Sequence, residues 1–193
     1  VRAILCPDKV TSQRWLDIME QAHGVGLRST ATIMFGHVDD ARSWVRHWRQ
    51  VLALQQRTQG FTEVVPLPFV SEGAPIYRRG GSRPGPTWRE ALLMHAVLRL
   101  TLGHAIPNVQ ASWVKLGQQG ALQMLSAGAN DLGGVLINES ITRAAGAAHG
   151  QGWTPSDMQE AISGCNRSPR QRTTLYGRVS DSRAVSWGTT PVR

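Results

Sequence analysis

The stretch from Asn108 to Glu139 constrains the fold most strongly, because it has the pattern of a strand, a short helix and a second strand. Asn108 to Val114 alternates polar and apolar residues, which is the period of a half-buried strand. Gln118 to Ala127 carries apolar residues at helical spacing, and a second apolar run, Leu132 to Ile137, follows it. Two strands joined by a helix pair in parallel. Ligands of such folds bind beside the carboxyl ends of the strands.

The rest of the chain repeats this alternation of strand and helix. Buried strands are predicted over Thr30–Phe35 and Phe61–Leu67, and a long loop rich in proline and glycine runs from Pro68 to Pro86. Four strands cannot close a barrel, which needs about eight. The pattern therefore fits either a small open sheet or half of a barrel. The residues expected to cap helices are Thr11 or Ser12, Asp39, Thr87 with Glu90, and Thr154, and one more helix is predicted over Ser140–His149.

Composition narrows the classes of function. The chain has 193 residues, enough for one domain with a sizeable core, and a net charge of +8. Its basic residues are almost all arginine and are scattered, which favours anionic small ligands. A basic nucleic-acid-binding module is the alternative from a different class, and the scatter disfavours it. Cys6 and Cys165 form neither a disulfide framework nor a metal motif, which suits a cytoplasmic protein.

The two ends of the sequence carry further expectations. No leader and no apolar run of membrane-spanning length occurs, so we expect no membrane association. The first residue is Val1 rather than methionine, which suggests a fragment or a processed product. The basic stretch from Ser180 to Arg193 is expected to be a frayed tail.

Polar side chains stand at the expected ends of the strands. Gln110 and Ser112 alternate, so they face the same side of the sheet, where inward-facing polar groups need partners. His37 ends the strand that begins at Thr30. The remaining candidates border the last strand: Asn130 and Asp131 before it, and Asn138 and Glu139 after it.

Each of these residues also has a plain structural interpretation. His37 can be a hydrogen-bonded structural histidine rather than a base. Asn130 can be a turn residue, and Glu139 can be a carboxylate in the first turn of a helix, where the dipole favours it. Arg172 and Tyr176 are expected to be surface or closing contacts.

Several longer motifs follow one another along the chain. They are Ala31–Val38 (ATIMFGHV), Pro66–Val70 (PLPFV), Ala74–Tyr77 (APIY), Arg83–Thr87 (RPGPT), Gln110–Lys115 (QASWVK), Ala129–Gly134 (ANDLGG), Asn138–Ser140 (NES), Ala144–Ala147 (AAGA) and Pro169–Tyr176 (PRQRTTLY). Together, to about Gly177, they resemble the carboxyl-terminal half of FO synthase, a radical S-adenosylmethionine family that builds the deazaflavin chromophore. The segment Ala31–Val38 alone is similar to menaquinone-pathway radical enzymes as well, of the aminofutalosine or dehypoxanthine futalosine type. Those enzymes are the second candidate for the family that this chain resembles.

The resemblance implies a fold and an activity. The fold would be α/β, the second half of a (β/α) TIM-like barrel over residues 1–153, with a terminal helix and basic tail over 154–193. The activity would be transfer of the 4-hydroxybenzyl group of L-tyrosine to 5-amino-6-(D-ribitylamino)uracil, in the synthesis of FO and coenzyme F420. The partners would be these two substrates, the missing amino-terminal half of the barrel, and a second radical domain or subunit.

The resemblance also implies cofactors and site residues. The family uses S-adenosylmethionine and a [4Fe-4S] cluster held by a Cys-x-x-x-Cys-x-x-Cys loop, and this sequence lacks that loop. We therefore expect no metal ligands in the chain and no activity from the chain alone. Ile33, Met34 and Gly36 would contact S-adenosylmethionine. The substrate would contact residues among His37, Gln110, Ser112, Asn130, Asp131, Asn138 and Glu139.

Overall fold

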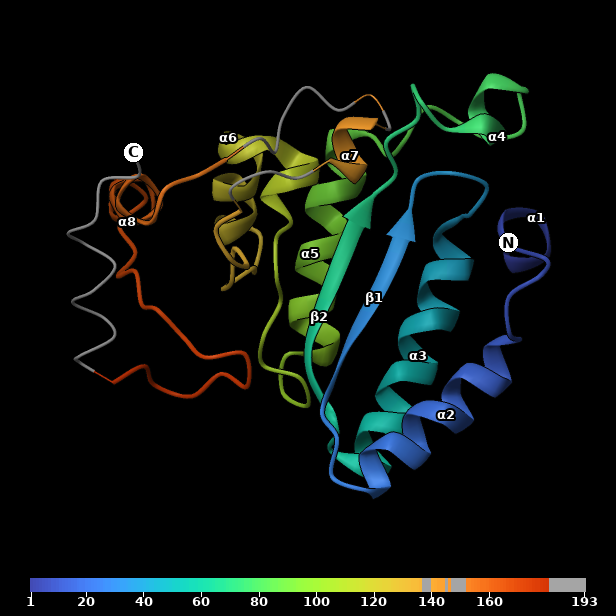
Figure 1. Cartoon of the computed structure of the whole chain (residues 1–193), viewed down its shortest axis with the longest axis horizontal. Helices are drawn as coiled ribbons and strands as arrows, with labels where there is room; N and C mark the ends of the chain where they lie inside the picture. The colour runs from blue at the N-terminus through green and yellow to red at the C-terminus, as the bar shows by residue number, and fades with distance from the viewer. Residues whose placement is uncertain (137–139, 145, 147–151, 181–193) are drawn as a thin grey trace.

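The computed structural model describes residues 1–136, 140–144, 146 and 152–180. Its sheet contains two parallel strands, β1 (Ser29–Phe35) and β2 (Phe61–Pro68), as predicted (Figure 1). Two further segments extend the sheet by single parallel bridges, Val64 to Val109 and Gln110 to Asp131. The sheet order therefore follows the chain order, which is the arrangement that strand–helix–strand units produce.

Helices α2, α3 and α5 lie beside the two strands, and α8 lies at the opposite end of the molecule from α1 and α2 (Figure 1). The N-cap hydroxyls predicted at Thr11, Thr87 and Thr154 each accept a hydrogen bond from the first helical turn, and Glu90 completes the capping box with Thr87. The described helices are α1 (Arg2–Leu5), α2 (Ser12–Gly24), α3 (Ala41–Thr58), α4 (Pro75–Arg78), α5 (Trp88–Leu102), α6 (Trp113–Ser126), α7 (Ile141–Ala144) and α8 (Pro155–Gly164).

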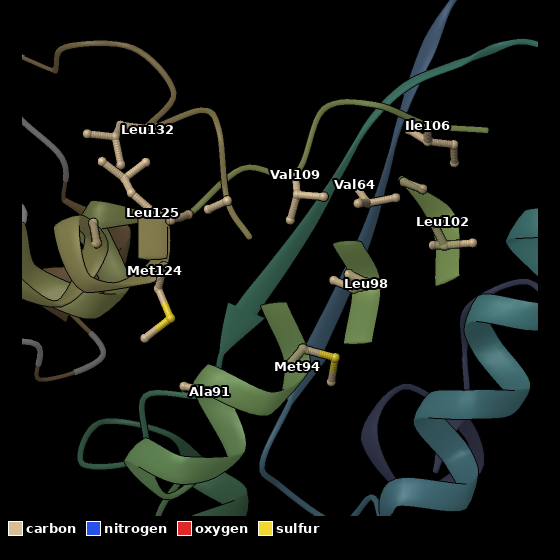
Figure 2. Packing of buried hydrophobic residues seen from close by; sticks show 14 of the residues in the cluster. Val64, Ala91, Met94, Leu98, Leu102, Ile106, Val109, Met124, Leu125 and Leu132 are labelled. Atoms are coloured by element: carbon tan, nitrogen blue, oxygen red, sulfur yellow. The ribbon is translucent and has the colours of Figure 1, made fainter. Parts of the chain in front are cut away.

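The core lies between one face of the sheet and the helices. Ala31 and Phe35 of β1 and Val64 of β2 point to this face and are fully buried. Figure 2 shows Val64 and Val109 beside Leu98 of α5, with Met124, Leu125 and Leu132 forming a neighbouring group. In α3, Trp48, Val51 and Leu54 are buried on a single stripe, as in a helix that packs one face on a core.

The sequence prediction is wrong for two strands and one cap. Residues 108–114 do not form a full strand, because only Val109 and Gln110 pair and α6 already begins at Trp113. The described part of the strand predicted over Leu132 to Ile137, residues 132–136, has no strand structure. The cap of α3 is Asp40, because the carboxylate of Asp39 binds the preceding turn instead. Of the helix predicted over Ser140–His149, only α7 lies among the described residues.

The second face of the sheet is not covered by helices α3 and α5. We refer to it as the open face. Because side chains alternate along a strand, it carries the residues that do not point to the core. They are Thr30, Thr32 and Met34 of β1, Glu63, Val65 and Leu67 of β2, and Gln110 beside Val65. Polar residues dominate its amino end and apolar residues its carboxyl end.

Two helices were not predicted, α1 and the single turn α4 within the loop that follows β2. Both contain four residues, too few for a helical period to be visible in the sequence. No helix in the described part of the chain is long and apolar enough to cross a membrane.

Candidate functional site at the carboxyl end of the sheet

The turn after β1 is held by the carboxylate of Asp39. Its oxygens accept hydrogen bonds from the backbone N–H of Gly36, at 2.9 and 3.1 Å, and of His37, at 2.8 Å. The indole N–H of Trp44 in α3 donates to the same carboxylate. A carboxylate that accepts several N–H groups fixes a tight turn. The turn is therefore rigid, and its backbone is ordered at the edge where ligands of parallel sheets bind.

His37 is buried within this turn, with 3% of its surface exposed. Its Nδ1 lies 2.7 Å from the backbone nitrogen of Val38 and 3.1 Å from Oδ1 of Asp39, and its Nε2 is 3.0 Å from the carbonyl oxygen of Met34. Burial, which outweighs the nearby Asp39 carboxylate, lowers the pKa of His37 and keeps the ring neutral. Both ring nitrogens are thus engaged by the protein. The structural interpretation of His37 has the stronger geometric support.

The loop over residues 69–86 covers the turn. The N–H of Arg83 donates to the carbonyl of His37 at 3.1 Å, and Phe69 N–H donates to Phe35 at 2.9 Å. Gly36, with a φ of 92°, lies so close to Pro86 that an added Cβ would be 2.3 Å from the proline ring. Gly36 is therefore enclosed by protein rather than open to a ligand.

The three residues proposed to contact S-adenosylmethionine differ in accessibility. Ile33 packs against the hydrophobic core, and Gly36 lies under Pro86. Met34 is 46% exposed on the open face, close to the end of β1. Met34 is the one of the three whose side chain could contact a ligand on the open face without rearrangement of the loop.

Gln110 lies on the open face, and Ser112, two residues farther along, is half-buried as Gln110 is. Gln110 is half-buried, and its side-chain amide lies against Gly133, where an added Cβ would be 2.9 Å from Nε2. Ser112 precedes α6 but makes no side-chain capping hydrogen bond to it. The structure therefore brings the amide of Gln110 to the face on which Met34 is exposed, and the placement of the Ser112 hydroxyl on that face stays a prediction.

Asn130 and Asp131 have partners within the protein. The side-chain oxygen of Asn130 accepts from the guanidinium of Arg99, at 2.7 Å, and from the N–H of Val109, at 2.8 Å. The carboxylate of Asp131 is 8% exposed, accepts from the N–H of Gly133 and binds Arg172. Asn130 joins the loop to α5, and Asp131 fixes the turn beside Gln110. Asn138 and Glu139 lie outside the described residues.

A polar cluster that sequence reasoning missed lies at the amino end of the open face. Arg172 donates to Asp131, lies 3.7 Å from the carboxylate of Glu63, and stacks over the ring of Tyr176 at 4.0 Å. The hydroxyl of Tyr176 donates to Glu63, and Thr30 donates to the same carboxylate at 2.8 Å. We refer to Glu63, Asp131, Arg172 and Tyr176 as the clasp. No local motif signals it, because 113 residues separate Glu63 from Tyr176.

The charges in the clasp affect the protonation of both donors. Burial and the two carboxylates raise the pKa of the Tyr176 phenol, so the hydroxyl stays protonated and can donate. For Arg172, the opposing carboxylates outweigh burial and raise its pKa. An arginine that meets a carboxylate and an aromatic face at once is held in a single orientation.

The described residues contain no group of three histidine, cysteine, aspartate or glutamate side chains placed to hold a metal ion. The two cysteines of the chain, Cys6 and Cys165, are fewer than the three thiolates that hold a radical-enzyme cluster. The chain's own residues therefore do not fit an iron–sulfur cluster.

The comparisons with known proteins agree with one another on the family to which this chain is similar. The family model described as the CofH/MqnC C-terminal region matches residues 58–185. The chain is 51% identical over 176 residues to the 5-amino-6-(D-ribitylamino)uracil–L-tyrosine 4-hydroxyphenyl transferase of Methanopyrus kandleri, which covers 91% of this chain and 48% of that protein. It is 49% identical over 179 residues to FO synthase of Nocardia farcinica, covering 93% of this chain and 21% of that protein.

A third relative agrees with the first two. FO synthase of Mycobacterium leprae is 47% identical over 176 residues, which cover 91% of this chain and 20% of that protein. The chain thus spans about half the length of the Methanopyrus protein and about a fifth of the FO synthases.

Proposed function

The chain belongs to the family of the CofH/MqnC C-terminal region, and from this membership we propose that it forms part of an enzyme that joins L-tyrosine to 5-amino-6-(D-ribitylamino)uracil in FO synthesis. The 51% identity to the Methanopyrus transferase across 91% of the chain is the observation that carries the proposal. The group transferred is the 4-hydroxybenzyl part of tyrosine.

The proposed setting is the second half of a (β/α) barrel, formed by residues 1–153, with residues 154–193 as a terminal cap. Two observations support it. The four paired segments lie in chain order and run parallel, and the helices α3 and α5 cover a single face. In a barrel the helices lie outside. The open face would then be the inner wall, and a preceding segment of the full enzyme would close it.

The cofactors of the proposed reaction are S-adenosylmethionine and a [4Fe-4S] cluster. When bound, they would supply the chemistry that abstracts a hydrogen atom from tyrosine. Because this chain has too few thiolates for the cluster, the cluster ligands belong in the proposal to another segment of the enzyme. This chain would contribute the apolar side chain of Met34 to the adenosine wall.

Gln110 and Ser112 are the proposed contacts to the ribitylaminouracil. A flat ring with several donors and acceptors can pair with an amide and a hydroxyl group held on one wall. Each such hydrogen bond contributes about 1 kcal/mol to binding. The carboxylate of Glu139 and the amide of Asn138 remain candidates for the same site. The clasp prevents Asp131 from serving in the same way, because Arg172 already occupies its carboxylate.

A chimera tests this proposal. The matching segment of the Methanopyrus protein is replaced by this chain, and the product is assayed anaerobically with S-adenosylmethionine, tyrosine and ribitylaminouracil. We expect coupled product, and Gln110→Ala should raise the KM for ribitylaminouracil by roughly fivefold, because one hydrogen bond is lost. The KM for S-adenosylmethionine should stay unchanged. A chimera that forms 5′-deoxyadenosine with both substrates present but no coupled product would contradict the proposal.

A menaquinone-pathway activity is the second candidate, because the matching family description includes MqnC. The same chimera, assayed with a futalosine-type substrate in place of ribitylaminouracil, separates the two. Turnover of the futalosine-type substrate alone would favour this second candidate.

A further inference from the structure

The segment after α8 turns back toward the strands (Figure 1), and Arg172 and Tyr176 within it contact Asp131 and Glu63; residues 172–178 form a small hairpin. Arg172 and Arg178 form its antiparallel bridge, and Thr173 N–H donates to the carbonyl of Gly177 at 3.0 Å. The φ of Tyr176 is 63°, in the left-handed region that non-glycine residues rarely adopt. This conformation places the phenol against Glu63 and beneath the guanidinium of Arg172. Such a backbone persists only where surrounding contacts hold it.

The clasp is continuous with the turn that supports Gln110. The carboxylate of Asp131 binds Arg172 with one oxygen and the N–H of Gly133 with the other. Gly133 has a φ of 74°, and a Cβ added to it would lie 2.9 Å from Nε2 of Gln110, so only glycine leaves room for the amide there. On its other side the turn is held by the indole N–H of Trp113, which donates to the carbonyl of Gly134 at 3.1 Å. The backbone carbonyl of Asp131 also accepts from the N–H of Ala111 at 2.8 Å. Loosening Arg172 would therefore remove the support that acts through the Asp131 carboxylate, while these backbone contacts remain.

We propose that Arg172 and Tyr176 are positioning residues, which fix the Asp131–Gly134 turn and through it the side chain of Gln110. The hairpin acts from the amino end of the open face, while the substrate would bind nearer the carboxyl end. Tyr176 orients Arg172, Arg172 holds Asp131, and Asp131 fixes Gly133 beneath the Gln110 amide. The inference rests on the proposed function, because it assigns this support to the ribitylaminouracil contact.

The first test measures the turn directly, without activity. Hydrogen–deuterium exchange of the full chain is compared for the wild type, Arg172→Met and Tyr176→Phe. We expect the peptide containing Gly133 to exchange roughly tenfold faster in Arg172→Met, because the carboxylate loses a charged partner. Tyr176→Phe keeps the ring under the guanidinium and loses only the hydroxyl, so a smaller increase is expected. Exchange in β2 should stay at the wild-type rate, and Arg170→Met, an exposed change in the same segment, serves as the control.

The second test measures the consequence in the chimera. Arg172→Met should raise the KM for ribitylaminouracil roughly fivefold while leaving the KM for S-adenosylmethionine unchanged. In a Gln110→Ala background the same substitution should have no further effect, because both changes act through one side chain. Arg172→Lys should not restore the wild-type KM, since lysine lacks the planar fork that spans the carboxylate and the ring.

The outcomes separate the inference from the function on which it rests. Unchanged exchange at Gly133 in both clasp variants would overturn the inference, as would additive effects of Arg172→Met and Gln110→Ala. If Gln110→Ala itself leaves the KM for ribitylaminouracil unchanged, the substrate placement is wrong, and exchange at Gly133 still decides whether the clasp holds the turn. Should Arg172→Met fail to fold, Tyr176→Phe carries both tests.

Discussion

Gly36 is the residue on which the turn after β1 most depends. Its φ of 92° is strained for any residue with a Cβ, and that Cβ would be 2.3 Å from Pro86. We expect Gly36→Ala to lower the free energy of unfolding by about 3 kcal/mol, from backbone strain and overlap together. Gly24→Ala is the matched control, because nothing lies within 4 Å of its added Cβ. Urea denaturation checks the pair, and equal midpoints would contradict the role of Gly36.

His47 of α3 gives the chain a dependence on pH. Burial, together with the positive charge of Arg2, lowers the pKa of His47 from 6.5 to about 4. As pH falls, the unfolded chain binds the proton first, so the stability that His47 contributes is complete above about 6.5 and is lost toward about 4. The loss should approach about 3 kcal/mol. Urea midpoints measured from pH 7 to pH 4 should therefore fall more steeply in the wild type than in His47→Gln, and parallel curves would contradict this.

Sequence reasoning succeeded at the residue scale where the partner is near in the chain. Thr87 and Glu90 are three residues apart, so their reciprocal capping could be predicted from the motif. Asp39 and Asp40 stand at adjacent positions, and the sequence alone could not decide which carboxylate caps α3. The pairing of Arg172 with Asp131 and Glu63 could not be predicted, because a basic residue in a polar segment carries no information about distant partners.

At the scale of the element, α5 depends on its capping box. The hydroxyl of Thr87 accepts from Glu90 N–H at 3.2 Å, and the carboxylate of Glu90 accepts from Thr87 N–H at 2.7 Å. Thr87→Ala should lower the free energy of unfolding by about 1 kcal/mol. Thr87→Ser keeps a capping hydroxyl and should therefore keep most of that contribution. Guanidinium denaturation of the three proteins checks this, and a destabilised Thr87→Ser variant would show that the methyl group matters instead.

The strand predicted over residues 108–114 shows what periodicity can and cannot reveal. The alternation is real, because Val109, Ala111 and Trp113 are buried while Gln110 and Ser112 are half-buried. Pairing nevertheless stops after Gln110, and α6 begins at Trp113, with a kink at Gly117. Alternation records which side chains face the core. It does not record how long a neighbouring strand stays within hydrogen-bonding distance.

At the scale of the whole molecule, the sheet has an unpaired edge. Among the described residues, β1 pairs with β2 alone, so its other edge offers backbone groups to a second chain, apart from the Thr32 backbone group that is hydrogen-bonded to His47. We expect the isolated chain to associate as its concentration rises, and Thr32→Lys on β1 should weaken that association. Val45→Lys on the exposed face of α3 should leave it unchanged. Sedimentation velocity over a concentration series checks this, and a monomer at every concentration would contradict it.

The clasp also sets an order of events during synthesis. Glu63 leaves the ribosome more than a hundred residues before its partner Tyr176, and at 5–20 residues per second this interval is on the order of ten seconds. Throughout that time β1 and β2 can already pair, while the open face lacks its last contact. Until Arg172 is synthesised, water solvates the carboxylates of Glu63 and Asp131, so their unpaired charges carry no desolvation penalty. They lose this water only when Arg172 binds them. The hairpin therefore contacts the sheet only after every paired segment has been synthesised, and a nascent chain that has not reached Arg172 carries these segments without the clasp.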